Sequence, residues 1–440
     1  MPLPLFALLM TLGAPASSAP AAAAAAPLTV GQFVALTLET SPSVRTAEQA
    51  FKAADAAYRS QLSAAILPTL SFSAAATPYG YNPNNGYVFQ TWRLNEHDVT
   101  YNTSLDLNVF NSFQDFQKTR ASKKALASAE RAFWTARQNQ AFASVQAFYD
   151  LDTKLKLLDV ARQNLSAQED QYNDSQDLYR NGMKSLADLL KSETDWRSSQ
   201  LRIVDAAADE RRSRVTANVL IGRDGLADLA LKSELQAGTT ALPDVERDLA
   251  GALEARPEIA GARADLERAK IAVQQAAQQL FPTFKVDALW NHVDQASFGN
   301  VPPPAGPPNP NYSVGLALSL PFGFNVASQV YNLMQAKAQE KEAEQALEAA
   351  IRQARNDVYG AYISLDHDIQ SYGLAVEKES IAQRTLDLVG SQYREGTADA
   401  IRMNQAQTDL LDAQVSRTQA LYSIFTDRAQ YQRAVGEQLW

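Results

Sequence analysis

The sequence Tyr179-Arg180-Asn181-Gly182 interrupts a long helical pattern, and Tyr393-Arg394-Glu395-Gly396 interrupts a second one 214 residues later. Another pair of motifs, Leu67-Pro68-Thr69 and Phe281-Pro282-Thr283, is separated by the same 214 residues. Two unrelated motifs that share one spacing indicate an internal duplication. We therefore expect one architecture that is built twice along the 440 residues of the chain.

Composition excludes several classes of function. The chain has no cysteine, which excludes a disulfide framework, a thiolate metal site, a thiol nucleophile and a lipidated N-terminal cysteine. The formal net charge of −9 argues against a nucleic-acid partner, because neutralising phosphates requires a basic face. A lumen lined by acidic groups would instead favour cations.

The first 26 residues are typical of an export signal. An apolar run from Leu3 to Leu12 is followed by small residues, and we expect cleavage between Ala19 and Ala26. No Lys or Arg precedes the apolar run. Beyond it, no window holds the roughly 18 consecutive apolar residues of a membrane-spanning helix. A chain that crosses a membrane must therefore cross it with strands.

Each repeat is predicted to run helix, strand, loop, strand, long helix, tight turn, helix. The first repeat covers 28–222 and the second 248–440, joined by a linker over 223–247. The helix-to-strand switches fall at Pro68 and Pro282, where the apolar period changes from three or four residues to two. We expect strands near 69–77, 100–110, 283–291 and 312–320, with loops over 79–100 and 301–308.

The predicted strands have one apolar and one polar face. Leu70, Phe72 and Ala74 alternate with Ser71 and Ser73. This alternation suits a soluble sheet with one covered face. It also suits a transmembrane barrel with a polar lumen, which the strand length of about ten residues, the aromatic strand ends and the export signal favour.

The helices are too long for a compact globule. No proline or glycine occurs from Phe113 to Asn181, so roughly 70 residues would form a helix on the order of 100 Å long. Leu151, Leu158, Leu165, Tyr172 and Tyr179 repeat every seven residues, which is the pattern of a supercoiled helix. Asn181-Gly182 ends this helix and Ser185 can cap the next one, so a hairpin is predicted there.

Four strands cannot close a transmembrane barrel by themselves. The smallest such barrels have about eight strands, and an open edge in lipid leaves backbone groups without partners. The strands of several copies must therefore combine. The predicted helices would then continue the wall of the barrel as a tube.

These features together resemble the TolC family of outer-membrane efflux proteins from about Leu28 to Trp440. The resemblance rests on the duplication, the two switches at Pro68 and Pro282, and the paired Tyr-Arg-x-Gly turns. It implies a mixed α and β membrane protein of a Gram-negative outer membrane, with an α-helical coiled-coil barrel reaching into the periplasm. It also implies a homotrimer with a shared twelve-stranded barrel, a periplasmic adaptor protein, and an inner-membrane pump of the RND or ABC type.

The resemblance assigns roles to two groups of residues. Family members place the adaptor at the hairpin turns, here Asn181, Gly182, Met183, Lys184 and Ser185 in the first and Glu395, Gly396, Thr397 and Ala398 in the second. Many members also carry constriction aspartates six and nine residues after the second turn glycine. Those positions are Arg402 and Gln405 here, and Asp188 and Asp399 are the nearest acidic candidates.

The turn residues can also be explained by backbone geometry alone, and the four constriction candidates by a solvated helix face. We formulate one hypothesis for the constriction, in which an ion pair between Arg402 and Asp188 holds the tunnel shut.

Nothing in the sequence indicates an enzyme or a cofactor. His97, His292 and His367 are scattered over a loop, a strand end and a helix, which predicts no metal site. No phosphate-binding loop or nucleophile elbow is present. Export of small molecules is the leading hypothesis, and an exit duct for type I protein or peptide secretion is the alternative. A structural coiled-coil surface protein is a third reading, which predicts strands at one terminus only.

Overall fold

The computed structural model describes residues 27–76, 79–82, 87–90, 99–232, 241–279, 281–293, 311–319, 326–395 and 397–439. The predicted signal peptide, the proline-rich loop at 301–308, His97 and Gly396 lie outside these residues. In chain order the elements are α1 (Val30–Thr40), α2 (Pro42–Ile66), β1 (Thr69–Ala76), β2 (Tyr79–Asn82), β3 (Tyr87–Gln90), β4 (Val99–Asn111), α3 (Gln114–Arg180), α4 (Leu186–Leu220), α5 (Val245–Ala255), α6 (Pro257–Gln278), β5 (Thr283–Val293), β6 (Asn311–Ser319), α7 (Val326–Arg394) and α8 (Ala400–Val435).

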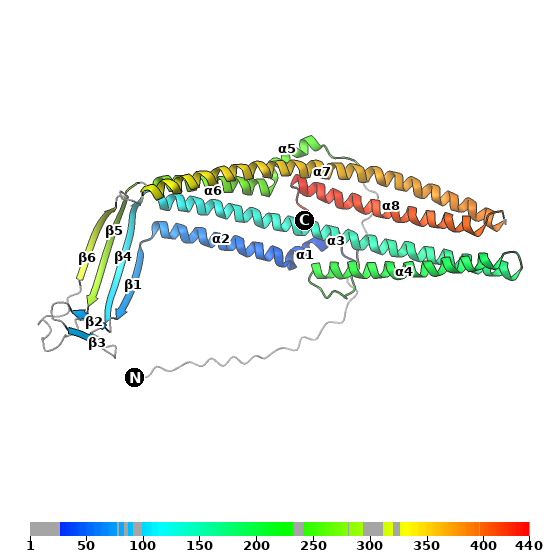
Figure 1. Ribbon diagram of the computed structural model, residues 1–440, viewed down its shortest axis with the longest axis horizontal. Helices are drawn as coiled ribbons and strands as arrows, with labels where there is room; N and C mark the ends of the chain where they lie inside the picture. Colours follow the sequence, from blue (N-terminus) through cyan, green and yellow to red (C-terminus); the bar gives the residue numbers. More distant parts are fainter. Residues whose placement is uncertain are drawn as a thin grey trace.

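The molecule is elongated, with the sheet at one end and two helical hairpins at the other (Figure 1). The helices begin where local chemistry dictates. Pro42 and Pro257 are the first residues of α2 and α6, where a missing N–H costs no helical hydrogen bond.

The four predicted main strands form one antiparallel sheet with the order β1-β4-β5-β6. Its apolar face carries exposed side chains on both edge strands, with Leu70 70% and Val314 77% exposed. On the polar face Asp106 lies directly opposite Asp287, and Asp287 lies opposite Gly315. A Cβ at Gly315 would stand 2.7 Å from a carboxylate oxygen of Asp287, so this position has no room for a side chain unless that carboxylate moves.

One prediction about a connecting segment needs correction. The segment 79–100, predicted to be a loop, contains β2 and β3, which pair antiparallel from Tyr79↔Gln90 to Asn82↔Tyr87. Two short runs that contain the β-prone residues Tyr, Val and Phe lie among Asn and Gly residues here, so they were not recognised as strands. Within the linker predicted over 223–247, Asp244 caps α5 and the helix begins at Val245.

The helices next to the sheet continue it in the same order. Helix α2 leads into β1, β4 leads into α3, α6 leads into β5, and β6 precedes α7. The neighbouring pairs α2·α3, α3·α6 and α6·α7 are packed together. The layer α2-α3-α6-α7 therefore matches the strand order β1-β4-β5-β6, as a wall that passes from sheet to helix would require.

The main hydrophobic core lies in the middle of the molecule. Phe33 packs edge-on against Phe148 with ring centroids 5.8 Å apart, and both side chains are fully buried together with Leu151 and Val358. Leu28 joins this region by a parallel bridge to Leu231. Among the described residues, no helix has an apolar stretch long enough to cross a lipid bilayer.

Candidate functional site

The two hairpins, α3/α4 and α7/α8, end together at the end of the molecule farthest from the sheet (Figure 1). Both turns fall at the repeated sequence motif. The predicted heptad seam of α3 is buried at Leu151 and Leu158 but opens toward the turn, where Tyr179 is 40% exposed. The seam of the first hairpin is therefore less enclosed at the turn than at Leu151 and Leu158.

The first turn follows the chemistry that its sequence predicts. Gly182 has a φ of +68°, and the N–H of Met183 donates to the carbonyl of Leu178 at 2.9 Å, which is a common helix-ending arrangement. Ser185 and Asp188 then form a reciprocal capping box that starts α4. The hydrogen bond from the Ser185 hydroxyl, at 2.7 Å, lowers the pKa of Asp188.

The second turn uses different donors. The N–H groups of Thr397 and Ala398 both donate to the carbonyl of Gln392, at 2.9 and 3.1 Å. Asp399 caps α8 by accepting a hydrogen bond from the N–H of Arg402 at 2.8 Å. Asp188 and Asp399 thus both act as capping residues of the returning helix.

A direct link joins the two turns. The ammonium of Lys184 lies 4.5 Å from the centroid of the Tyr393 ring, which is a favourable cation–π geometry. Tyr393 is 6% exposed, and its hydroxyl lies 3.3 Å from the hydroxyl of Ser175. Ser175 in turn lies 2.9 Å from Ser192 of α4. One tyrosine therefore contacts both α3 and the turn of the other hairpin.

The seam between α3 and α8 is also polar farther from the turns. Gln168 donates a 2.8 Å hydrogen bond to Gln407, and both side chains are buried. The side-chain oxygens of Gln168 and Gln171 have no protein partner. Gln168 and Ser175 lie three residues after the heptad residues Leu165 and Tyr172, and therefore on the same face of α3. The heptad register could have identified this seam from the sequence.

The predicted constriction residues do not form a latch inside one chain. Within the described part of the chain, Arg402 makes no salt bridge with Asp188, whose carboxylate is bonded to Ser185. Gln405 donates to Asp409 at 2.8 Å along its own helix. The roles of Asp188, Asp399, Arg402 and Gln405 as a tunnel constriction stay a prediction about assembled copies.

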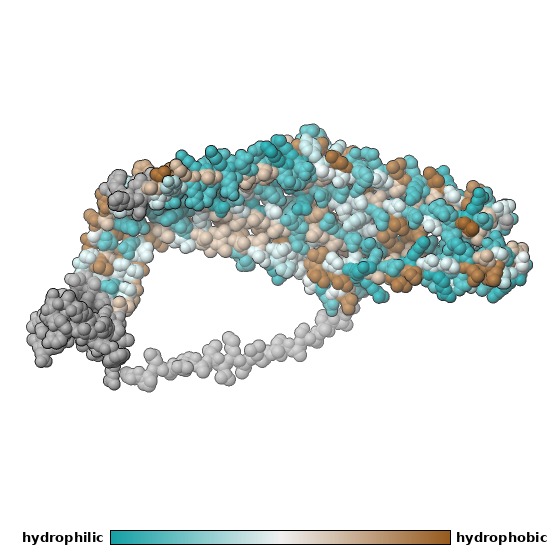
Figure 2. Space-filling view, viewed as in Figure 1, coloured by the Kyte–Doolittle hydropathy of each residue, from teal (hydrophilic) through white to brown (hydrophobic). Residues whose placement is uncertain are grey.

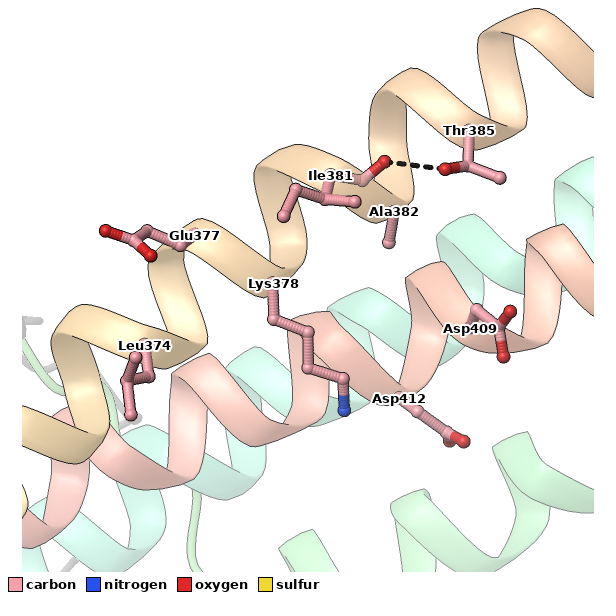
Figure 3. A pocket seen from close by; sticks show the side chains of 8 residues that line it. All are labelled: Leu374, Glu377, Lys378, Ile381, Ala382, Thr385, Asp409 and Asp412. Atoms are coloured by element: carbon pink, nitrogen blue, oxygen red, sulfur yellow. Dashed lines mark hydrogen bonds between the residues drawn. The ribbon is translucent and has the colours of Figure 1, made fainter.

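A shallow groove of about 460 Å³ runs along the α7/α8 hairpin. Figure 3 shows Leu374 and Ile381 on the α7 side, with Lys378 extending toward α8 beside Asp412. Thr385 is held by a 2.9 Å hydrogen bond to the carbonyl of Ile381. Within the described ranges, no group of three or more His, Asp or Glu side chains is arranged to hold a metal ion.

The duplicated body and its paired turns match a known family. The sequence model of the family described as outer membrane efflux protein matches residues 34–223 and 249–437. The chain belongs to the outer membrane efflux protein family. The two matched segments correspond to the two repeats, which explains why the turn motif occurs twice. No curated protein matches the chain.

Solved channels share the fold of this family member. The VceC outer membrane protein from Vibrio cholerae is 17% identical with a TM-score of 0.77, over 93% of this chain and 97% of that one. The MtrE outer membrane channel from Neisseria gonorrhoeae, solved in its open state, is 20% identical with a TM-score of 0.76, over 93% and 89%. The Campylobacter jejuni CmeC outer membrane channel is 17% identical with a TM-score of 0.74, over 92% and 85%.

Proposed function

We propose that three copies of this chain join their sheets into a transmembrane β-barrel in a Gram-negative outer membrane. Their helices continue the barrel as a passive duct through which an inner-membrane pump exports small molecules. The observation that carries this proposal is the open sheet, whose edge strands β1 and β6 each have one unpaired side among the described residues. Its apolar face is exposed on both edges.

The sheet requires partners if it lies in lipid. Every backbone N–H and C=O in the hydrocarbon region must be paired, so the edges have to meet other strands. A barrel needs about eight strands or more, and the main sheet of one chain supplies four. Three copies would supply about twelve strands, which is the number that the family resemblance implies.

The helices carry a matching requirement. Within one chain, α3 of the first repeat packs against α8 of the second. The repeat predicts an equivalent contact between α7 of one copy and α4 of the next. Helix α7 has an exposed apolar stripe at heptad spacing along the groove of Figure 3, and α4 has exposed apolar residues of its own: Leu374, Ile381 and Leu388, and Leu190, Leu201 and Val204.

The hairpin turns are proposed to dock the periplasmic adaptor. Met183 is exposed at the end of the first hairpin, and the first turn also presents Lys184. An exposed methionine beside a cation is a surface that a partner protein can cover.

The test is the conductance of the purified full chain in planar lipid bilayers. We expect stable channels, and loss of export in a deletion strain, measured as increased sensitivity to antibiotics, dyes or metals. Pull-down with the turn variant Met183→Ala, against Met334→Ala as a methionine control far from the turns, tests adaptor docking. A chain that stays monomeric and periplasmic after cell fractionation contradicts the proposal. Normal drug resistance with a defect in peptide or protein release points to secretion instead.

A further inference from the structure

The junction between β4 and α3 contains the only described non-glycine residues with a positive φ, Ser112 at 56° and Phe113 at 59°. A bulky residue rarely adopts this conformation. The buried Ser112 hydroxyl holds the backbone in this conformation, because the hydroxyl lies 2.8 Å from the carbonyl oxygens of both Phe281 and Pro282. Strain that neighbouring structure maintains in this way often marks a functional position.

The strained turn directs aromatic rings outward. Phe113 is 58% exposed, and its ring packs edge-on against Phe110 with centroids 5.1 Å apart. Phe110 pairs with Phe284 on the apolar side of the sheet. Phe116, one turn into α3, is 60% exposed. The apolar surface of the strands therefore continues past the junction onto the first turn of the helix.

Cations follow the aromatic residues on the same face of α3. Phe113, Phe116, Arg120 and Lys123 are spaced by three, four and three residues, which places them along one face. The guanidinium of Arg120 lies 5.7 Å from the centroid of the Phe116 ring. Arg120 donates to the amide oxygen of Gln117 at 3.2 Å. Neither Arg120 nor Lys123 forms a salt bridge with any carboxylate that the structure describes.

The charge at this end of α3 is mainly positive. The first sixteen residues of α3 contain four basic residues and the single acid Asp115, although the whole chain has a net charge of −9. Several cations farther along the long helices form pairs with carboxylates, as Lys191 does with Asp195 and Arg352 does with Glu348. The unpaired cations at this end of α3 thus leave a positive surface next to an apolar one.

The second repeat presents the same order. Tyr331 and Met334, at the start of α7, are 69% and 59% exposed. Lys337 and Lys341 follow on that side of the helix at spacings of three and four residues. Figure 2 shows apolar residues where the sheet meets the helices and mainly hydrophilic ones farther along α6 and α7. Both repeats therefore place exposed apolar residues before cations in chain order, and the 214-residue repeat makes Lys337 the equivalent of Lys123.

We propose that these two faces form a collar that binds the headgroups of anionic phospholipids in the periplasmic leaflet. The collar comprises Phe113, Phe116, Arg120 and Lys123 of α3, and Tyr331, Met334, Lys337 and Lys341 of α7. This inference rests on the proposed insertion of the strands into the outer membrane.

The spacing fits a bilayer surface. Aromatic residues favour the boundary between acyl chains and headgroups, and Lys and Arg stems lie along apolar surface while their charged ends reach the phosphates. Phe116 and Lys123 are separated by about 10 Å along the helix axis at 1.5 Å per residue. The headgroup layer is roughly 5–8 Å thick on each side of the hydrocarbon. With the Phe116 ring at its inner boundary, Arg120 lies about 6 Å farther along the axis and within this layer. The stem of Lys123 can reach back toward the layer, because helical side chains tilt toward the N-terminus of the helix.

The test measures lipid retention by the full-length protein with native mass spectrometry. We expect phosphatidylglycerol to be retained more strongly than phosphatidylcholine, and increasingly so at low salt. Arg120→Gln with Lys123→Gln should weaken phosphatidylglycerol retention by about fivefold per cation removed. Lys337→Gln with Lys341→Gln should do the same independently. The control pair Arg202→Gln with Arg384→Gln removes exposed cations from the hairpins and should change nothing.

Three results overturn the inference alone while channels still conduct normally. They are equal retention of both lipids by the wild type, unchanged retention by both collar variants, and displacement of the lipid by soluble glycerol phosphate or inorganic phosphate. The last result would indicate an anion site rather than a lipid surface. A wild-type chain that forms no channels in any bilayer overturns the proposed function, and this inference with it.

Discussion

The contact of Lys184 with Tyr393 predicts how tightly the two hairpin turns are held together. Replacing Tyr393 by Phe keeps the ring beneath the ammonium but removes the hydroxyl that lies 3.3 Å from Ser175. Replacing Lys184 by Met keeps an unbranched apolar side chain and removes the charge. The two changes therefore separate the hydrogen bond from the cation–π contact.

Each change should weaken the link by a similar amount. A neutral hydrogen bond contributes about 1 kcal/mol, and a partly exposed cation–π contact contributes about 1 kcal/mol. If the hairpins part when the mouth opens, each variant shifts the equilibrium toward the open state by about fivefold. Because both act on one ring, we expect the double variant to fall short of the additive value of about thirtyfold.

The assay is the open probability of single channels in planar bilayers, with export measured in cells. Lys184→Arg retains a cation over the ring and serves as the matched control, so its open probability should stay close to that of the wild type. Equal open probabilities for the wild type, Tyr393→Phe and Lys184→Met would refute the reasoning. The link would then hold the turns together without taking part in opening.

Other predictions follow from the caps and charges. Ser185→Ala should lower the free energy of unfolding of the first hairpin by about 1 kcal/mol. The hydrogen bond from Ser185 lowers the pKa of Asp188. The stabilisation from this bond is therefore present at neutral pH and is lost as the pH falls through that pKa. Burial and the neighbouring Asp368 raise the pKa of Asp427 to about 6. The contribution of the protonated carboxyl to the free energy of unfolding is therefore complete below about pH 4, the pKa of an unfolded Asp, and is lost as the pH rises through 6. In Asp427→Asn the melting temperature should change less between about pH 4 and pH 6. Asp287→Asn should reduce the preference of the pore for cations, measured as a smaller reversal potential in a salt gradient, because it removes one of two facing carboxylates from the polar side of the sheet.

Much of the fold could be predicted because prolines and glycines restrict the backbone at a few positions. Pro68 and Pro282 cannot donate to a helix, and the apolar period changes directly after each of them. The structure has strands from Thr69 and from Thr283. The hairpin of β2 and β3 escaped prediction because its strands have four residues each, which is too short for a period to stand out among Asn and Gly.

The candidate site was predictable only where it depends on neighbours in the sequence. Gly182 and Ser185 act within their own turn, so their roles follow from turn chemistry. Tyr393 was recognisable as part of a repeated motif, but its contacts with Lys184 and Ser175 join separate hairpins and depend on how the helices pack. Tertiary structure sets which distant helices pair. The heptad register shows which face of a helix is packed, but it does not show which helix packs against that face.

The duplication has produced two seams of different chemistry rather than two copies of one seam. The repeat places Ala382 at the position equivalent to Gln168, and Ala398 at the position equivalent to Lys184. The seam within a chain therefore has buried amides and a cation–π contact, whereas its counterpart between copies would lack both and would meet the exposed apolar stripe of α7. Water can replace polar contacts at a small net cost, but separating apolar surfaces costs about 25 cal/mol for each Å² exposed. We therefore expect a mouth built from these seams to part within each chain before it parts between copies.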